Sequence, residues 1–194
     1  MKIIPFVLAS LFILTAGKAH EAIDTATSVM NYSFTVHHIS VTSRKDFTAT
    51  IRDFESRLGV FAPESIKSLA TENPNVESVT SKVEAMAGSS GFMRFGAVRM
   101  MGDLLPLVGK PIAHAHQYVI GNPLFAVQMT QHNSRAGLYA PLRILIFEDD
   151  SKLTYLEYDL PSSLFGQFKD ERITKIAMML DKKVEDLTKA AAGR

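Results

Sequence analysis

Two apolar strands joined by a short acidic turn constrain the fold of this chain more than any other stretch. Residues 142–147 read LRILIF and are apolar on both faces, which predicts a central strand of a sheet. Residues 153–158 read LTYLEY and alternate with aromatic partners, which predicts a second strand. The turn from Asp149 to Lys152 is too short for a crossover, so the two strands must pair antiparallel.

The segments before this hairpin predict further strands and a short helix. Residues 92–100 and 111–120 have strand character, the first interrupted by Gly96, and a loop is expected over residues 102–110. Gly121-Asn122-Pro123 then forms a turn. The Asn122 side chain can cap a helix that begins at Pro123, where the missing N–H of proline leaves no hydrogen bond unmade.

Two amphipathic helices frame the strands. Residues 32–41 predict a first strand, after which Ser43 and Asp46 form a capping-box pattern that predicts a helix ending at Gly59. Residues 172–191 predict a long closing helix with one apolar stripe. The stripe consists of Ile173, Ile176, Ala177, Leu180, Val184 and Leu187.

The pattern predicts a single α+β domain over residues 32–191, a mainly antiparallel sheet packed against an N-terminal amphipathic helix and a long C-terminal helix. Residues 60–91 fit this plan least well. A helix beginning at Pro63, a break at Asn73-Pro74-Asn75, a second weak stripe and a Gly/Ser-rich exit indicate a helical insertion.

The first nineteen residues have the pattern of a signal peptide. Lys2 precedes an apolar run from Ile3 to Thr15, and Gly17-Lys18-Ala19 offers small residues around a cleavage point. The run is shorter than the ~20 residues that span a bilayer, although an uncleaved anchor remains the rival interpretation. We therefore expect an exported protein, periplasmic or secreted, with a polar lead over residues 20–31 and no membrane contact after cleavage.

Composition narrows the functional classes. The chain is 46% apolar and 21% charged, as expected of a folded globular domain. A formal charge of +1 gives no indication of nucleic-acid binding. The sequence contains no cysteine, which excludes disulfides, thiolate metal ligands and thiol nucleophiles.

Several motifs resemble one known family. In order they are Gly121-Asn122-Pro123, Met129, residues 141–149 and residues 153–161. Together with the first and last helices they are similar to the domain-of-unknown-function 302 (DUF302) family, over roughly residues 34–190 with an interruption at 60–91. The resemblance implies a small α+β domain that tends to be dimeric. Many members carry cysteine where Gly121 stands, so no thiol-based role can transfer to this chain.

A metal or haem site is one open interpretation. His114 and His116 would lie on one face of a strand, about 7 Å apart, and could supply half of a zinc or iron site. His37 or His38 and a carboxylate of Glu157 or Asp159 could complete it, but no third ligand is fixed by spacing. Histidines merely tolerated on a half-exposed strand face are the simpler interpretation.

A non-catalytic module that binds a small ligand or another protein is the leading interpretation. A sheet covered by a long helix often leaves an apolar pocket with a few polar groups at its mouth. The residues expected near that mouth are Tyr118, Asn122, Tyr155, Tyr158 and Asp159. The alternative is that Asn122 only caps a helix and the tyrosines are ordinary strand residues. No catalytic residue or cofactor is identified, and an enzyme of unrecognised type is the third class.

A homodimer is also expected. Met178 and Met179 widen the apolar stripe of the closing helix beyond what one sheet contact requires. This flank is therefore predicted to meet a second copy of the chain.

Overall fold

The computed structural model describes residues 28–71, 75–95, 99–111 and 114–194. The chain divides into two units, Met1–Ser33 and Phe34–Arg194, and all the helices and strands of the described residues belong to the second unit. The predicted signal peptide, residues 1–19, lies outside the described residues. Among the helices that are described, none combines the length and the apolar character needed to cross a bilayer.

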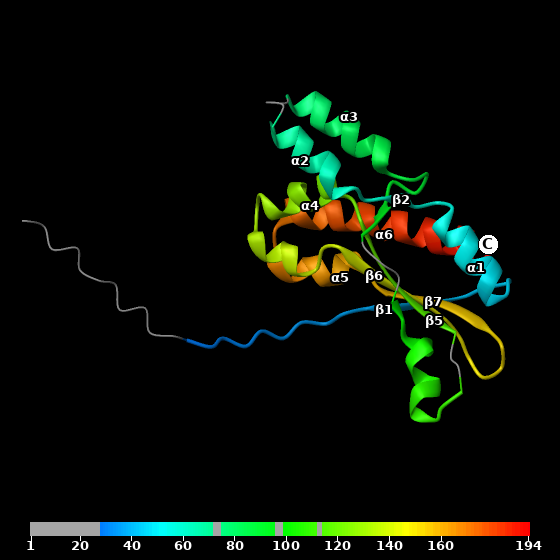
Figure 1. Cartoon of the computed structure of the whole chain (residues 1–194). Helices are drawn as coiled ribbons and strands as arrows, with labels where there is room; N and C mark the ends of the chain where they lie inside the picture. The colour runs from blue at the N-terminus through cyan, green and yellow to red at the C-terminus, as the bar shows by residue number, and fades with distance from the viewer. Residues whose placement is uncertain (1–27, 72–74, 96–98, 112–113) are drawn as a thin grey trace, which may run out of the picture. The chain divides into compact units, whose positions relative to one another are not determined.

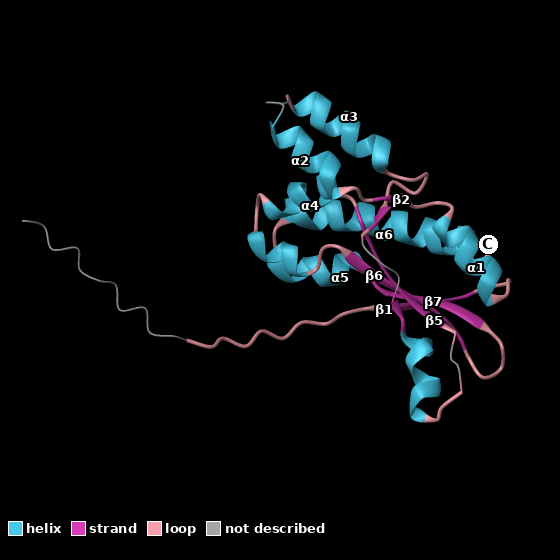
Figure 2. Cartoon of the chain, viewed as in Figure 1, coloured by secondary structure: helices cyan, strands magenta, loops and turns pink. Residues whose placement is uncertain are grey.

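The strands form one mixed, mainly antiparallel sheet, as predicted (Figure 2). Its order is β1-β7-β6-β5-β3-β2, and β4 also pairs with β5. The only parallel pair among these described strands is β2 with β3. The bounds are β1 His38–Thr42, β2 Gly59–Val60, β3 Met93–Arg94, β4 Arg99–Met100, β5 Ala115–Gly121, β6 Leu142–Glu148 and β7 Thr154–Asp159.

The predicted hairpin is confirmed as β6 and β7. Leu145 pairs with Glu157, and β6 lies between β7 and β5, which makes it a central strand. The Asp149 carboxylate accepts hydrogen bonds from the backbone N–H groups of Ser151 and Leu153, each at 2.9 Å. The side chain thus adds to the backbone hydrogen bonds that Asp149 makes with Leu153 and Lys152 across the turn.

Helices cover one face of this sheet (Figure 1). The α-helices are α1 Phe47–Glu55, α2 Pro63–Thr71, α3 Val76–Met86, α4 Pro123–Thr130, α5 Pro161–Phe165 and α6 Glu171–Ala191. Three 3₁₀ helices, η1 Met101–Val108, η2 Ser134–Leu138 and η3 Gly166–Phe168, complete the described elements.

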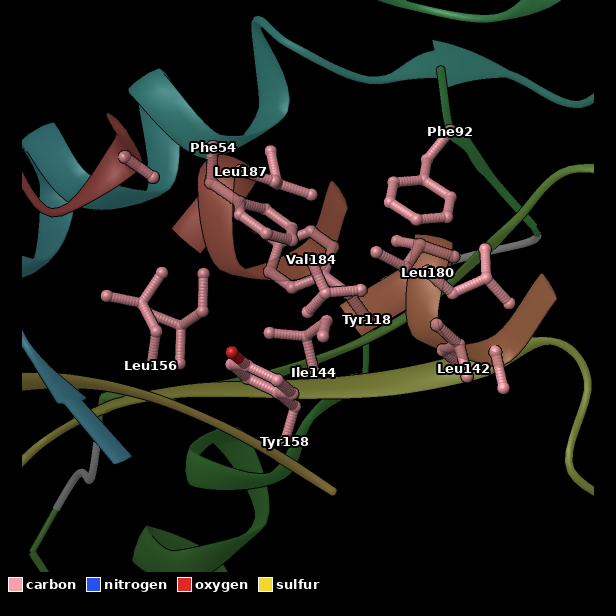
Figure 3. Close-up of a cluster of buried hydrophobic side chains, with 14 of the residues drawn as sticks. Phe54, Phe92, Tyr118, Leu142, Ile144, Leu156, Tyr158, Leu180, Val184 and Leu187 are labelled. Carbon is pink, nitrogen blue, oxygen red and sulfur yellow. The ribbon is translucent and has the colours of Figure 1, made fainter. Parts of the chain in front are cut away.

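The core lies between α6, α1 and the sheet. Leu180, Val184 and Leu187 of α6 point toward the buried residues of β6 and β7 (Figure 3). Strand β7 alternates between buried and partly exposed residues, so this strand gives the core one face. The apolar stripe predicted for the closing helix is confirmed, because all its members are buried except Ile176, which is partly buried and packs against the core.

The first strand and the first helix differ from prediction. Strand β1 begins at His38 rather than Tyr32. Helix α1 is capped by Asp46, whose carboxylate accepts from the Ala49 N–H at 2.7 Å, and not by Ser43. Ser43 instead bonds the Thr50 hydroxyl at 2.8 Å. A carboxylate nearer the helix took the capping role that the capping-box pattern assigned to the hydroxyl.

Gly59 was predicted to end α1 and has a different role. The helix already ends at Glu55, with Ser56 as its C-cap, and Gly59 lies in β2. A Cβ at Gly59 would lie 1.8 Å from the Met86 carbonyl oxygen. Glycine is therefore required by the close approach of two backbones.

Three other segments also differ from their predicted bounds. The strand expected over residues 92–100 is present as β3 and β4. The strand expected from Pro111 begins at Ala115, and the loop expected over residues 102–110 contains η1. Pro106 lies inside η1, where its fixed φ suits a short tight helix.

Candidate aromatic pocket at the start of helix α4

A cavity of about 300 Å³ lies where β5 passes into α4. Strand β6 and helices α5 and α6 each contribute a residue to its wall. Phe92 and Phe95, which flank β3, line it as well. Its lining residues are Phe61, Phe92, Phe95, Gly121, Asn122, Pro123, Phe125, Ala126, Val127, Met129, Ala140, Pro141, Leu142, Phe165 and Leu180. Asn122 is the one polar side chain in this set, so the wall is almost wholly apolar.

Five of the fifteen described lining residues are phenylalanines. Phe61 and Phe95 stack with ring centroids 4.4 Å apart. Phe92 and Phe125 meet edge to face at 6.4 Å. These are the offset and edge arrangements that aromatic pairs prefer, so the rings hold one another in place around the space.

Gly121 allows the chain to close tightly on one side of the cavity. A Cβ at this position would lie 3.2 Å from Pro141 Cβ and 3.3 Å from a ring carbon of Phe95. Both distances are tighter than ordinary contact, so any larger residue must displace a neighbour or project into the cavity.

Asn122 anchors the polar edge. Its side-chain oxygen, Oδ1, accepts from the Leu124 N–H at 2.9 Å, which confirms the predicted helix cap. Its amide nitrogen donates to the Gly91 carbonyl at 3.0 Å. The side chain is 7% exposed, and both of its polar ends are engaged. Asn122 therefore ties α4 to the loop before β3.

Tyr118 does not line this cavity. It is fully buried, and its hydroxyl donates to Glu55 Oε1 at 2.9 Å. Arg94 Nη1 donates to the same oxygen at 2.9 Å. Burial, reinforced by the Glu55 carboxylate, raises the pKa of Tyr118. The three side chains form a structural cluster between α1, β3 and β5.

The other predicted mouth residues lie elsewhere. The Tyr155 hydroxyl donates to Asp149 Oδ2 at 3.2 Å, beside the hairpin turn. Tyr158 lies beside a separate groove toward the end of α6. Asp159 Oδ1 is 3.0 Å from His38 Nδ1, and the residue borders a groove near Phe34. Of the five residues predicted from the sequence, only Asn122 lines the aromatic cavity.

His114, one residue before β5, and His116 within β5 lie beside helix α1. The rings of His114 and His116 each lie 5.1 Å from the Phe47 ring. Burial lowers the pKa of His116, and His114 Nδ1 is 3.7 Å from Glu148 Oε1. The described residues contain no group of three histidine, aspartate or glutamate side chains placed to hold a metal ion. The predicted pair thus gains no third ligand from the described part of the chain.

Sequence reasoning missed the aromatic lining. Phe92 and Phe95 belong to a segment predicted only as a strand, and Phe61 lies in the segment predicted as an insertion. The sequence does show phenylalanines before and after Gly121, at positions 92, 95 and 125. Their convergence depends on pairing between residues far apart in the sequence, which periodicity does not reveal.

Comparison with known proteins identifies a family model. The model described as "Domain of unknown function DUF302" matches residues 67–191. The match begins inside the segment predicted as an insertion and ends at the last residue of α6. No curated protein matches the chain.

A solved structure shares the fold. It is the crystal structure of an uncharacterized conserved protein DUF302 from Bacillus stearothermophilus, with 17% sequence identity and a TM-score of 0.55. The alignment covers 79% of this chain and 97% of that one. At this identity the likeness concerns the fold alone.

Proposed function

The chain belongs to the DUF302 family, and from that premise we propose that it is a non-catalytic module that binds a small apolar ligand in the cavity at the start of α4. The observation that carries the proposal is the cavity itself. Its aromatic rings line a partly open space, and an apolar wall of this kind is typical of small-molecule pockets.

The size of the cavity limits the ligand. Small-molecule pockets typically measure about 300–1,000 Å³, and a cavity of about 150 Å³ can hold benzene. A volume of about 300 Å³ therefore suits one or two aromatic rings or a short acyl chain. Contacts with phenylalanine rings would recognise such a ligand by shape and dispersion.

The lining favours binding over catalysis. The one polar side chain in the wall, Asn122, already uses both ends of its amide in structural hydrogen bonds. No histidine, carboxylate or hydroxyl side chain belongs to the described lining set. General acid–base or nucleophilic chemistry needs such a group within hydrogen-bond reach of the substrate.

The proposed module acts outside the cytoplasm. This part of the proposal rests on residues 1–19, whose apolar run and small-residue end are typical of a signal peptide.

A neutral two-ring probe whose fluorescence rises in apolar surroundings, such as 6-propionyl-2-(dimethylamino)naphthalene, tests the proposal. The probe should gain fluorescence on binding to the wild-type protein and raise its melting temperature. A ligand at about 100 times its Kd stabilises a fold by about 2.7 kcal/mol, or roughly 5–10 °C for a domain of this size. Ala126→Phe fills the cavity from α4 and should abolish both effects.

Gln128→Phe is the matched control. It adds the same ring to the same helix at an exposed position outside the lining set, so probe binding should persist. If Ala126→Phe overpacks the cavity and unfolds the protein, Ala126→Leu makes the same test with less volume. Probe binding that is equal in wild type and a folded cavity-filled variant would refute the proposed function.

A further inference from the structure

A lysine of helix α6 stands beside the aromatic cavity. Leu180 lines the cavity, and Lys183 follows almost one helical turn later. Lys183 Nζ lies 5.6 Å from the centre of the Phe125 ring, which belongs to the cavity wall. The same ammonium would be 2.9 Å from a Cβ at Gly91, the residue whose carbonyl accepts from Asn122. Lys183 is not one of the described lining residues, but it lies beside Phe125 of the wall and near Gly91, to which Asn122 is bonded.

The positive charge of Lys183 has no carboxylate partner within the described ranges. Its neighbours on α6 differ in this respect. Lys182 pairs with Asp186, and Lys189 pairs with Glu185. Lys183 instead lies over the face of the Phe125 ring, a position that cations adopt readily. This contact leaves the N–H donors of the Lys183 ammonium available for hydrogen bonds.

We infer that the ligand of this cavity is an amphipathic anion, an aromatic or short aliphatic carboxylate whose acid group pairs with Lys183. The inference rests on the proposed function and specifies the class of ligand. The apolar body would occupy the space among the phenylalanines. The carboxylate would remain at the edge, where the half-buried ammonium supplies a charge-assisted hydrogen bond.

Two probes with the same apolar body test this inference. Naphthalene-2-acetate carries the carboxylate, and naphthalene-2-acetamide replaces it with a neutral group. Calorimetric titration of the wild-type protein should show that the acetate binds about fivefold more tightly than the amide, the upper end for a partly exposed ion pair. Lys183→Met keeps most of the side-chain volume and should remove this preference while leaving the affinity for the amide unchanged.

Two variants serve as controls. Lys182→Met removes the same charge from the same helix at an exposed position and should keep the preference for the acetate. Lys183→Arg retains a cation at the site and should keep it as well. If Lys183→Met fails to fold, Lys183→Gln removes the charge with a polar side chain and makes the same test.

The outcomes separate the inference from the function on which it rests. Equal affinity for the acetate and the amide in wild-type protein, or a preference that survives in Lys183→Met, overturns the inference alone. Failure of both probes to bind overturns the proposed function and the inference together.

Discussion

Two leucines of α6 allow the cavity to be tested through stability. Leu180 is 3% exposed and Leu187 is 2% exposed, so both are buried to the same degree. Only Leu180 lines the cavity. A side chain beside empty space has fewer neighbouring atoms to lose when it is truncated. Leu187→Ala should therefore cost about 3–5 kcal/mol of unfolding free energy, and Leu180→Ala about 2–3 kcal/mol.

Urea denaturation of both variants measures this difference directly. The two-state fit should give the same dependence on urea for both variants, with the lower midpoint for Leu187→Ala. The melting temperature should fall by roughly 2–4 °C for each kcal/mol lost. Lys175→Ala, on the opposite face of α6, should change the free energy by less than ~0.5 kcal/mol. If Leu180→Ala costs as much free energy as Leu187→Ala or more, Leu180 does not border empty space.

Four further predictions concern other parts of the chain. The hydrogen bond to Asp159 raises the pKa of His38 above about 6.5, so His38 stabilises the fold below that pH and loses its effect as the pH rises through the folded-state pKa. An NMR titration should show a lower His38 pKa in Asp159→Asn, and an unchanged pKa would contradict the contact. Replacing residues 60–91 with a short Gly/Ser linker should leave a cooperative thermal transition but abolish probe binding, because the segment contributes a ring to the cavity; an aggregated or molten product would show that it belongs to the core. Met178 is 62% exposed, and Met178→Lys should convert the proposed dimer to a monomer in sedimentation. A wild-type protein that sediments as a monomer would contradict the dimer prediction. N-terminal sequencing of the protein from its own host should begin near His20, and recovery of Met1 would contradict cleavage.

The central hairpin and the closing helix could be predicted because their signals are local. Ile144 and Leu156 are buried as the strand patterns required, and α6 begins at Glu171, one residue before its predicted start. Boundaries were less accurate where neighbouring polar residues compete. Ser43 and Asp46 both suit a helix cap, and only the folded chain shows that the carboxylate reaches the Ala49 N–H.

The site could be predicted only in part, because it depends on contacts between distant residues. Asn122 was identified from its position before Pro123, a local pattern. The role of Gly121 follows from its closeness to Pro141 and Phe95, which no local pattern reveals. Tyr118 was placed on the correct strand, but its hydroxyl turned out to be engaged by Glu55 of a different element. Amphipathic patterns predict which face is buried, not which buried residues surround a cavity.

The claim that the cavity at the start of α4 binds a ligand is best tested by locating the bound ligand. Intermolecular NOEs between naphthalene-2-acetate and methyl groups of the protein report which side chains lie within a few ångströms of the rings. We expect NOEs to the methyl groups of Ala126 and Leu180, both of which line the cavity. NOEs confined to Leu138 and Val36, which line the groove near Phe34, would contradict that claim.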